Sequence, residues 1–105
     1  MRLAAQLDED FKGLPGEALV RRGLEDFTSG TETVGAFLVQ IGAPRLRLLD
    51  IPLPENIDHD ADGKLYFLLG REFGNEAHST YNSYIRELVS FKRALERRVN
   101  EQKTS

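Results

Sequence analysis

The last quarter of the chain constrains the fold more than any other segment. From about residue 75 to residue 102 the sequence contains neither proline nor glycine, the two residues that most often end or bend a helix. Its apolar side chains recur at a near-heptad spacing, namely Tyr81, Tyr84, Ile85, Leu88, Phe91, Leu95 and Val99. This spacing places them on one face of a helix. The segment therefore predicts a long C-terminal helix whose apolar face needs other helices to cover it.

Glycine and proline divide the preceding residues into shorter segments. Pro15 and Pro44 stand where a helix can begin, because a first-turn proline loses no N–H that the helix needs. Thr31 suits the N-cap of a further helix. Glycine follows each apolar stripe, as it commonly does at a helix end, at Gly13, Gly30, Gly42 and Gly74. The predicted short helices cover residues 2–12, 15–29, 31–41, 44–50 and 64–73.

These segments predict an all-α fold, a small bundle of about five helices with one long C-terminal helix. The one β-like run, residues 64–69, has no hairpin partner bounded by turn residues. A chain of 105 residues suits one hydrophobic core, so we expect a single helical domain over residues 1–105, with residues 103–105 as a frayed tail. Residues 51–62, rich in proline and acidic side chains, are expected to form its longest loop. The predicted core includes Leu24, Phe27, Phe37, Ile41, Leu48, Leu68, Leu88 and Leu95.

Composition excludes several classes of function. The chain has no cysteine, which rules out disulfides, zinc–thiolate sites and thiol nucleophiles. No apolar run approaches the roughly 18 residues of a membrane span, and acidic residues at 8–10 come too early for a secretory signal. Residues 30–35 have the glycine spacing of a phosphate loop but lack its Lys-Ser/Thr. We therefore expect a cytoplasmic protein with no enzymatic activity, no cofactor and no membrane association.

Carboxylates alternate in the loop just before a glycine, with Asp58, Asp60 and Asp62 preceding Gly63. This run resembles the opening of an EF-hand calcium loop, in which alternating oxygen ligands converge on one hard cation. The resemblance implies weak divalent-cation binding at residues 58–63, because the bidentate glutamate that closes such loops would fall at Leu69. The alternative is an exposed acidic loop in which Asp62 caps the following helix.

A second local pattern covers residues 34–51, whose layout is similar to a helix-turn-helix. An apolar helix is followed by Gly42-Ala43-Pro44 as the tight turn, and then by a short second helix. In this interpretation Leu48 and Ile51 pack the second helix inward. The alternative is a plain helical hairpin within a bundle, where the same apolar residues form core.

By this resemblance, the second helix would be the recognition helix of a nucleic-acid-binding protein. Arg45 and Arg47 would be its phosphate or base contacts, and Leu46 and Leu49 would face the DNA. The whole chain is mildly acidic, with 14 basic and 17 acidic residues, whereas domains that bind nucleic acid through bulk charge are usually basic. Nucleic-acid binding is therefore an alternative and not the leading hypothesis.

The leading hypothesis is a small helical module that acts through protein–protein contact or self-association. We expect its contact surface at the end of the C-terminal helix, where Leu95 and Val99 are bordered by Arg93, Arg97 and Arg98. The shorter helices are not expected to cover this end. An apolar strip with a cationic border suits an amphipathic partner helix or a second copy packed antiparallel. The alternative is that this end of the helix frays into solvent.

Overall fold

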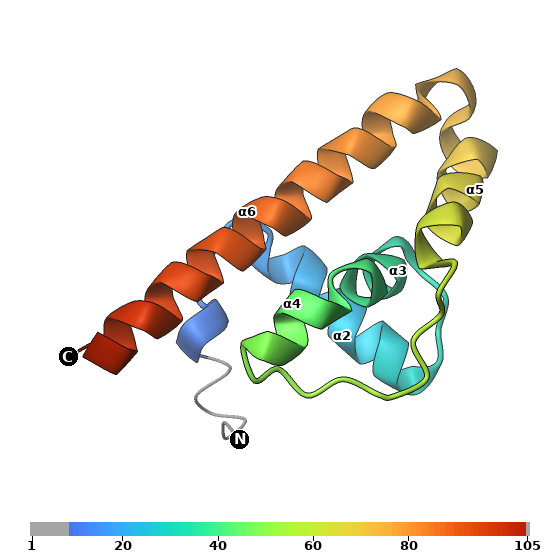
Figure 1. Cartoon of the computed structure of the whole chain (residues 1–105). Coiled ribbons are helices and arrows are strands. Elements are labelled where there is room, and N and C mark those ends of the chain that lie inside the picture. The colour runs from blue at the N-terminus through green and yellow to red at the C-terminus, as the bar shows by residue number, and fades with distance from the viewer. Residues whose placement is uncertain (1–8, 105) are drawn as a thin grey trace.

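The computed structural model describes residues 9–104 and consists of helices joined by short loops (Figure 1). A helical turn at residues 9–11 precedes α2 (Glu17–Ser29), α3 (Val34–Ile41), α4 (Ala43–Leu48), α5 (Ala61–Phe73), the 3₁₀ turn η1 (Gly74–Glu76) and α6 (Ala77–Thr104). No strand occurs in residues 9–104. The predicted all-α bundle with a long C-terminal helix is confirmed.

The helix ends follow local sequence closely. Gly30 ends α2 with a left-handed backbone (φ 80°), and its N–H donates to the carbonyls of Asp26 and Phe27. Thr33, and not the predicted Thr31, is the N-cap of α3, where its hydroxyl accepts a 3.2 Å hydrogen bond from the N–H of Ala36. Because the Thr33 hydroxyl also donates to Asp26 at 2.8 Å, the same side chain ties the start of α3 to the end of α2.

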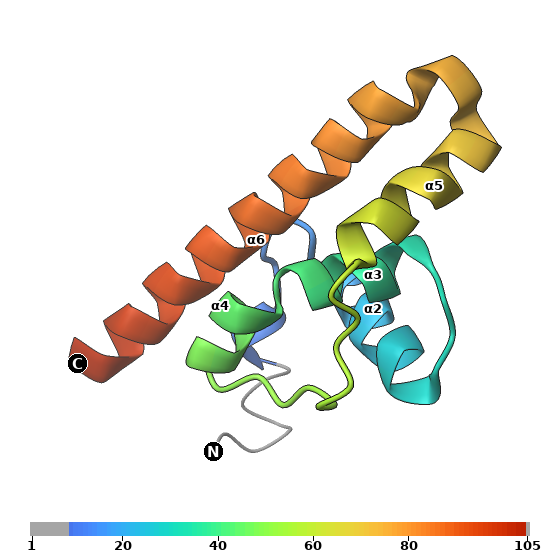
Figure 2. The same cartoon turned by 45° about the vertical axis from the view of Figure 1, so that its right-hand side comes forward.

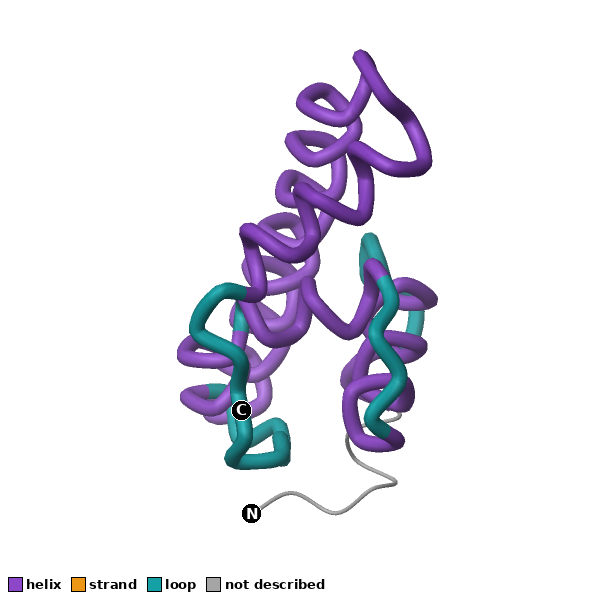
Figure 3. Tube along the Cα trace, turned by 90° about the vertical axis from the view of Figure 1, so that its right-hand side faces the viewer, coloured by secondary structure: helices purple, strands orange, loops and turns teal. Residues whose placement is uncertain are grey.

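The long helix α6 organises the molecule, whose extents are 48 × 25 × 19 Å (Figure 1). Its first half pairs with α5 in a helical hairpin that projects from the body. Its second half lies beside α4 and the helical turn at residues 9–11 (Figure 1), and α2 and α3 lie to the right of α4 in the view of Figure 2. Residues 49–60 run as an extended loop from α4 to α5, and Figure 3 shows this loop in teal. This segment overlaps the predicted loop at residues 51–62, and α5 begins at Ala61, one residue before the predicted end of that loop.

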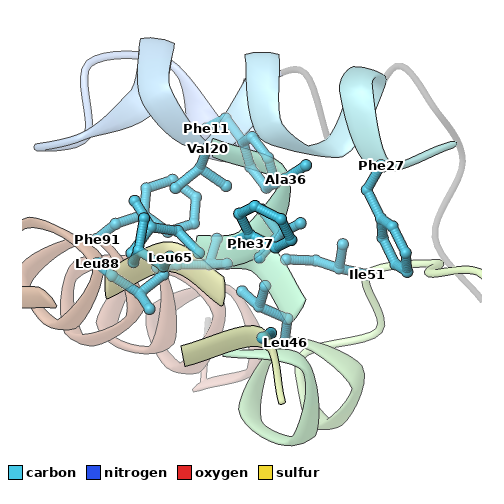
Figure 4. Packing of buried hydrophobic residues seen from close by; sticks show 14 of the residues in the cluster. Phe11, Val20, Phe27, Ala36, Phe37, Leu46, Ile51, Leu65, Leu88 and Phe91 are labelled. Carbon is cyan, nitrogen blue, oxygen red and sulfur yellow. The ribbon is translucent and has the colours of Figure 1, made fainter. Parts of the chain in front are cut away.

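The core forms where these helices meet the second half of α6. Figure 4 shows Phe11, Val20, Phe37, Leu46 and other side chains converging on Leu88 and Phe91. The rings of Phe11 and Phe91 meet edge to face, with centroids 5.0 Å apart. Such aromatic pairs stabilise a core beyond the area they bury.

The structure confirms four predicted core residues and corrects the others. Phe27, Phe37, Leu88 and Leu95 are buried, whereas Leu24, Ile41 and Leu68 are only partly buried against the core cluster. The prediction for Leu48 is wrong, since its side chain is 73% exposed. In the six-residue helix α4, Leu46 faces the core instead, and Leu48 lies two residues further round the helix.

The structure describes the two ends of the chain only in part. Residues 2–8 of the first predicted helix, with Leu3 and Leu7, lie outside the described residues, and residues 9–11 are helical as expected. Helix α6 continues to Thr104, Ser105 lies outside the described residues, and the fraying of residues 103–105 stays a prediction.

Candidate functional site

The predicted apolar strip at the end of α6 is covered by the chain itself. Leu95 is fully buried and Val99 is 6% exposed, so neither offers a surface to a partner in this fold. The helical turn at residues 9–11 lies beside this end of α6 (Figure 1). The prediction that Leu95 and Val99 face a partner is therefore wrong, because both side chains belong to the hydrophobic core of the chain.

The three arginines beside this strip have different surroundings. Arg98 points its Nη1 at the main chain of the N-terminal turn, where it donates to the carbonyls of Lys12 at 2.7 Å and Asp10 at 2.9 Å. Carbonyls at the end of a helical turn lack partners within it. Arg98 thus anchors the N-terminal segment. Arg93 and Arg97 lie on the outer face of α6, where both side chains are exposed.

The helix-turn-helix interpretation predicts the wrong face of α4. Leu46 is fully buried and Leu49 is 8% exposed, whereas Leu48 points to solvent. The residues expected to face DNA are therefore core, although Ile51 is buried as expected. A single residue, Gly42, separates α3 from α4. This connection is tighter than the three- or four-residue turn of a typical helix-turn-helix.

Both candidate nucleic-acid contacts interact within the chain. An Arg45 Nη1 lies 3.7 Å from a carboxylate oxygen of Glu96 on α6. Arg47 donates from Nη2 to the carbonyl of Pro54 at 2.9 Å, which holds the loop against α4. Burial lowers the pKa of Lys92, and the positive charge of Arg45 lowers it further.

The three aspartates of the EF-hand-like run do not converge. Helix α5 begins at Ala61, which puts Asp60 at its N-cap and Asp62 in its first turn. Asp58 accepts a 2.8 Å hydrogen bond from the N–H of Asp60 and pairs with Lys64. Within residues 9–104, no three histidine, aspartate or glutamate side chains are arranged to hold a metal ion. The structure does not assemble the predicted cation site, because a helix replaces the loop that would wrap the ion.

Asp58 instead holds this segment in place. The hydrogen bond from Lys64 lowers the pKa of Asp58, and the N–H of Asp60 lowers it further. Its own N–H donates at 2.9 Å to Oε1 of Gln40, a nearly buried side chain on α3. The amide of Gln40 also donates to the carbonyl of Ala36. A lone glutamine in the apolar run 34–41 was the sequence signal for this attachment of the loop to α3.

The structure reveals a surface that the sequence did not single out, a groove of about 580 Å³ between α5 and the start of α3. We call it the α5 groove. Phe37 and Leu68 form its apolar wall, and Phe67 stands beside them with 69% of its surface exposed. The groove is lined by Glu32, Phe37, Asp60, Gly63, Lys64, Phe67, Leu68 and Arg71. Leu65 and Leu69 are the buried leucines of α5, and Phe67 lies on a different face of the helix. This position relative to the two leucines is the only feature of the sequence that indicates an exposed Phe67.

Charge is distributed unevenly along the α5 groove. Glu32 and Asp60 both act electrostatically on Lys64, which places them near the start of α5. Lys64 is paired with Asp58 and so adds little free positive charge there. Arg71 lies seven residues further along the helix, or about 10 Å at 1.5 Å per residue, and makes no ion pair with any described residue. The groove therefore has an acidic end and a basic end with an aromatic ring between them.

Within residues 9–104, none of the helices is both long enough and apolar enough to cross a membrane. Comparison of the chain with protein-family models, with curated proteins and with solved structures found no match.

Proposed function

We propose that this protein is a binding module that acts by contact with another protein chain, and that the α5 groove is its contact surface. The observation that carries the proposal is the exposure of Phe67 beside an apolar wall. Four large apolar side chains are exposed in the described part of the chain, and three of them lie on α5, namely Tyr66, Phe67 and Phe73. Of these three, Phe67 lines the groove, whereas the ring of Tyr66 lies against His78 and Tyr81 of α6. An exposed apolar side chain that continues into further apolar surface marks an interaction site more often than an isolated one does.

The chemistry of the groove supports a protein partner. Removing the Phe67 ring from water contributes about 1.5–3 kcal/mol to association, and aromatic residues are common among those that dominate binding energy. The polar residues around it, Lys64, Asp60 and Arg71, can form the solvated rim that such interfaces have. A partner side chain inserted against Phe37 and Leu68 would complete an apolar centre.

Site-specific photo-crosslinking tests the proposed function. A photoreactive phenylalanine analogue replaces Phe67 in one variant and Glu25 in a control, since Glu25 is exposed on α2, outside the groove. In cells of origin, we expect a crosslinked adduct from position 67 and none from position 25. Adducts of equal yield from both positions, or none from position 67, would remove the groove as the contact surface.

A further inference from the structure

The positions of the charged residues along the α5 groove indicate which partner it binds. We infer that the groove binds a second copy of this chain, with the two α5 helices antiparallel about a two-fold axis. This inference rests on the proposed function and names its partner. Its basis is self-complementarity, because the surface that meets its own copy in a symmetric dimer must match itself when reversed.

In an antiparallel dimer, the basic end of one groove meets the acidic end of the other. An antiparallel copy places Arg71 of each chain beside Asp60 and Glu32 of the other, and the symmetry makes this contact twice. Within one chain Arg71 has no ion pair among residues 9–104, and neither Asp60 nor Glu32 pairs with a described cation at salt-bridge distance. These charges are therefore available for an intermolecular pair. A parallel copy would set like charges side by side, which disfavours that orientation.

The apolar residues match in the same arrangement. Pairing Asp60 with the partner's Arg71 puts the two-fold axis midway between residues 60 and 71, close to residues 65 and 66. Phe67 then lies opposite the partner's Lys64, near the partner's Gly63. The methylene stem of the partner's Lys64 can then pack against the ring, while its ammonium stays paired with Asp58. Helix α5 is at the edge of the molecule, where a second copy can reach it (Figure 1).

The size of the groove sets the expected strength. One helix pair and a few flanking residues fall in the lower size class of specific interfaces, below about 1,200 Å² of total buried surface. We therefore expect a reversible dimer whose population changes with concentration over about 1 to 500 μM, the range of transient contacts.

Sedimentation velocity of the full chain over that range is the first test. Wild type should shift from monomer to dimer, and Phe67→Glu should remain monomeric at every concentration. Leu48→Glu is the matched control, since Leu48 is similarly exposed but lies on α4 outside the groove. It should dimerise as wild type does. A wild type that stays monomeric at the highest concentration, or a Phe67→Glu variant that dimerises, would overturn the inference.

Charge exchange tests the antiparallel arrangement itself. Arg71→Glu makes position 71 acidic like position 60, and Asp60→Arg makes position 60 basic like position 71. Each variant alone should lose at least about tenfold in dimer affinity, the effect of removing favourable charge pairs and adding like ones. A mixture of the two in equal amounts should dimerise, because position 71 of each chain then meets the opposite charge at position 60 of the other. The double variant, with both changes in one chain, should also recover. Circular dichroism of each variant checks folding, and Asp60 makes no side-chain capping bond that its replacement would remove.

These outcomes separate the inference from the function on which it rests. Dimers that form without rescue in the mixture would reject the antiparallel pairing. A monomeric wild type that still crosslinks at position 67 to a different protein would reject self-association and leave the proposed function standing. A monomeric wild type without crosslinks would reject both.

Discussion

Gly23 and Gly35 bring the backbones of α2 and α3 into direct contact. A Cβ atom built on Gly23 would lie 2.3 Å from the carbonyl oxygen of Gly35, and one built on Gly35 would lie 2.9 Å from the Cα of Gly23. Neither helix has room for a side chain at the crossing. The placement of α3, and with it Phe37 in the α5 groove, depends on this pair of glycines.

Gly23→Ala should therefore destabilise the fold by about 3 kcal/mol, at the upper end of what overpacking costs, because backbone atoms must move apart. Urea unfolding followed by circular dichroism measures the change. Gly70→Ala is the matched control. A Cβ at Gly70, in α5, would meet no atom within 4 Å, so alanine should stabilise that helix by about 0.5–1 kcal/mol. Equal changes in unfolding free energy for Gly23→Ala and Gly70→Ala would contradict the close contact between the α2 and α3 backbones.

Because Leu95 is buried, its truncation should reduce the stability of the fold and not the binding of a partner. Leu95→Ala should cost about 2–5 kcal/mol in free energy of unfolding, as truncations of fully buried leucines do. Leu48→Ala should change it by no more than about 0.5 kcal/mol, because that side chain is exposed. Chemical denaturation of both variants checks the pair. A neutral Leu95→Ala would restore the end of α6 as a free surface.

Arg98→Ala should loosen the N-terminal segment. The substitution removes the donor to the carbonyls of Asp10 and Lys12, which we expect to cost about 1–2 kcal/mol, since hydrogen bonds from charged donors contribute more than neutral ones and this site is partly exposed. Hydrogen exchange at residues 11–14 should speed up in the variant. Arg97→Ala, one residue earlier on the exposed face, should leave both stability and exchange unchanged.

The hydrogen bonds of Glu17 should make the stability of the fold depend on pH in the acid range. The N–H of Gly13 donates to its carboxylate, and this bond, followed by the one from Arg21, lowers the pKa of Glu17 below its ordinary 4.5. The stabilisation is therefore present above the ordinary pKa and is lost as the pH falls through the lower pKa of the folded state. Glu17→Gln should be less stable than wild type at about pH 6, and the difference should shrink towards about pH 3. A pH-independent difference in melting temperature between the two proteins would contradict this.

Several helix ends and the overall class could be predicted from the sequence alone, whereas the start of α3 at Thr33 could not. Gly30, Gly42 and Gly74 end their helices as predicted, because a helix end is decided by residues within about one turn of it. The unbroken heptad pattern of residues 75–102 predicted α6 for the same reason, since its apolar residues lie close together in the chain.

Which surfaces stay exposed was decided only by the tertiary structure. Leu95 and Val99 follow the apolar pattern of α6, but the pattern does not record that the N-terminal turn lies against this end of the helix, where Arg98 bonds to residues 86 and 88 positions away in the chain. In a helix as short as α4, two faces are nearly equal in apolar content, and packing against the rest of the core selected Leu46 over Leu48. The α5 groove has the same origin, because Phe37 and Phe67 belong to separate helices. Burial of a side chain depends on contacts between segments that are distant in the chain. The periodicity of apolar residues describes only the spacing within a single segment.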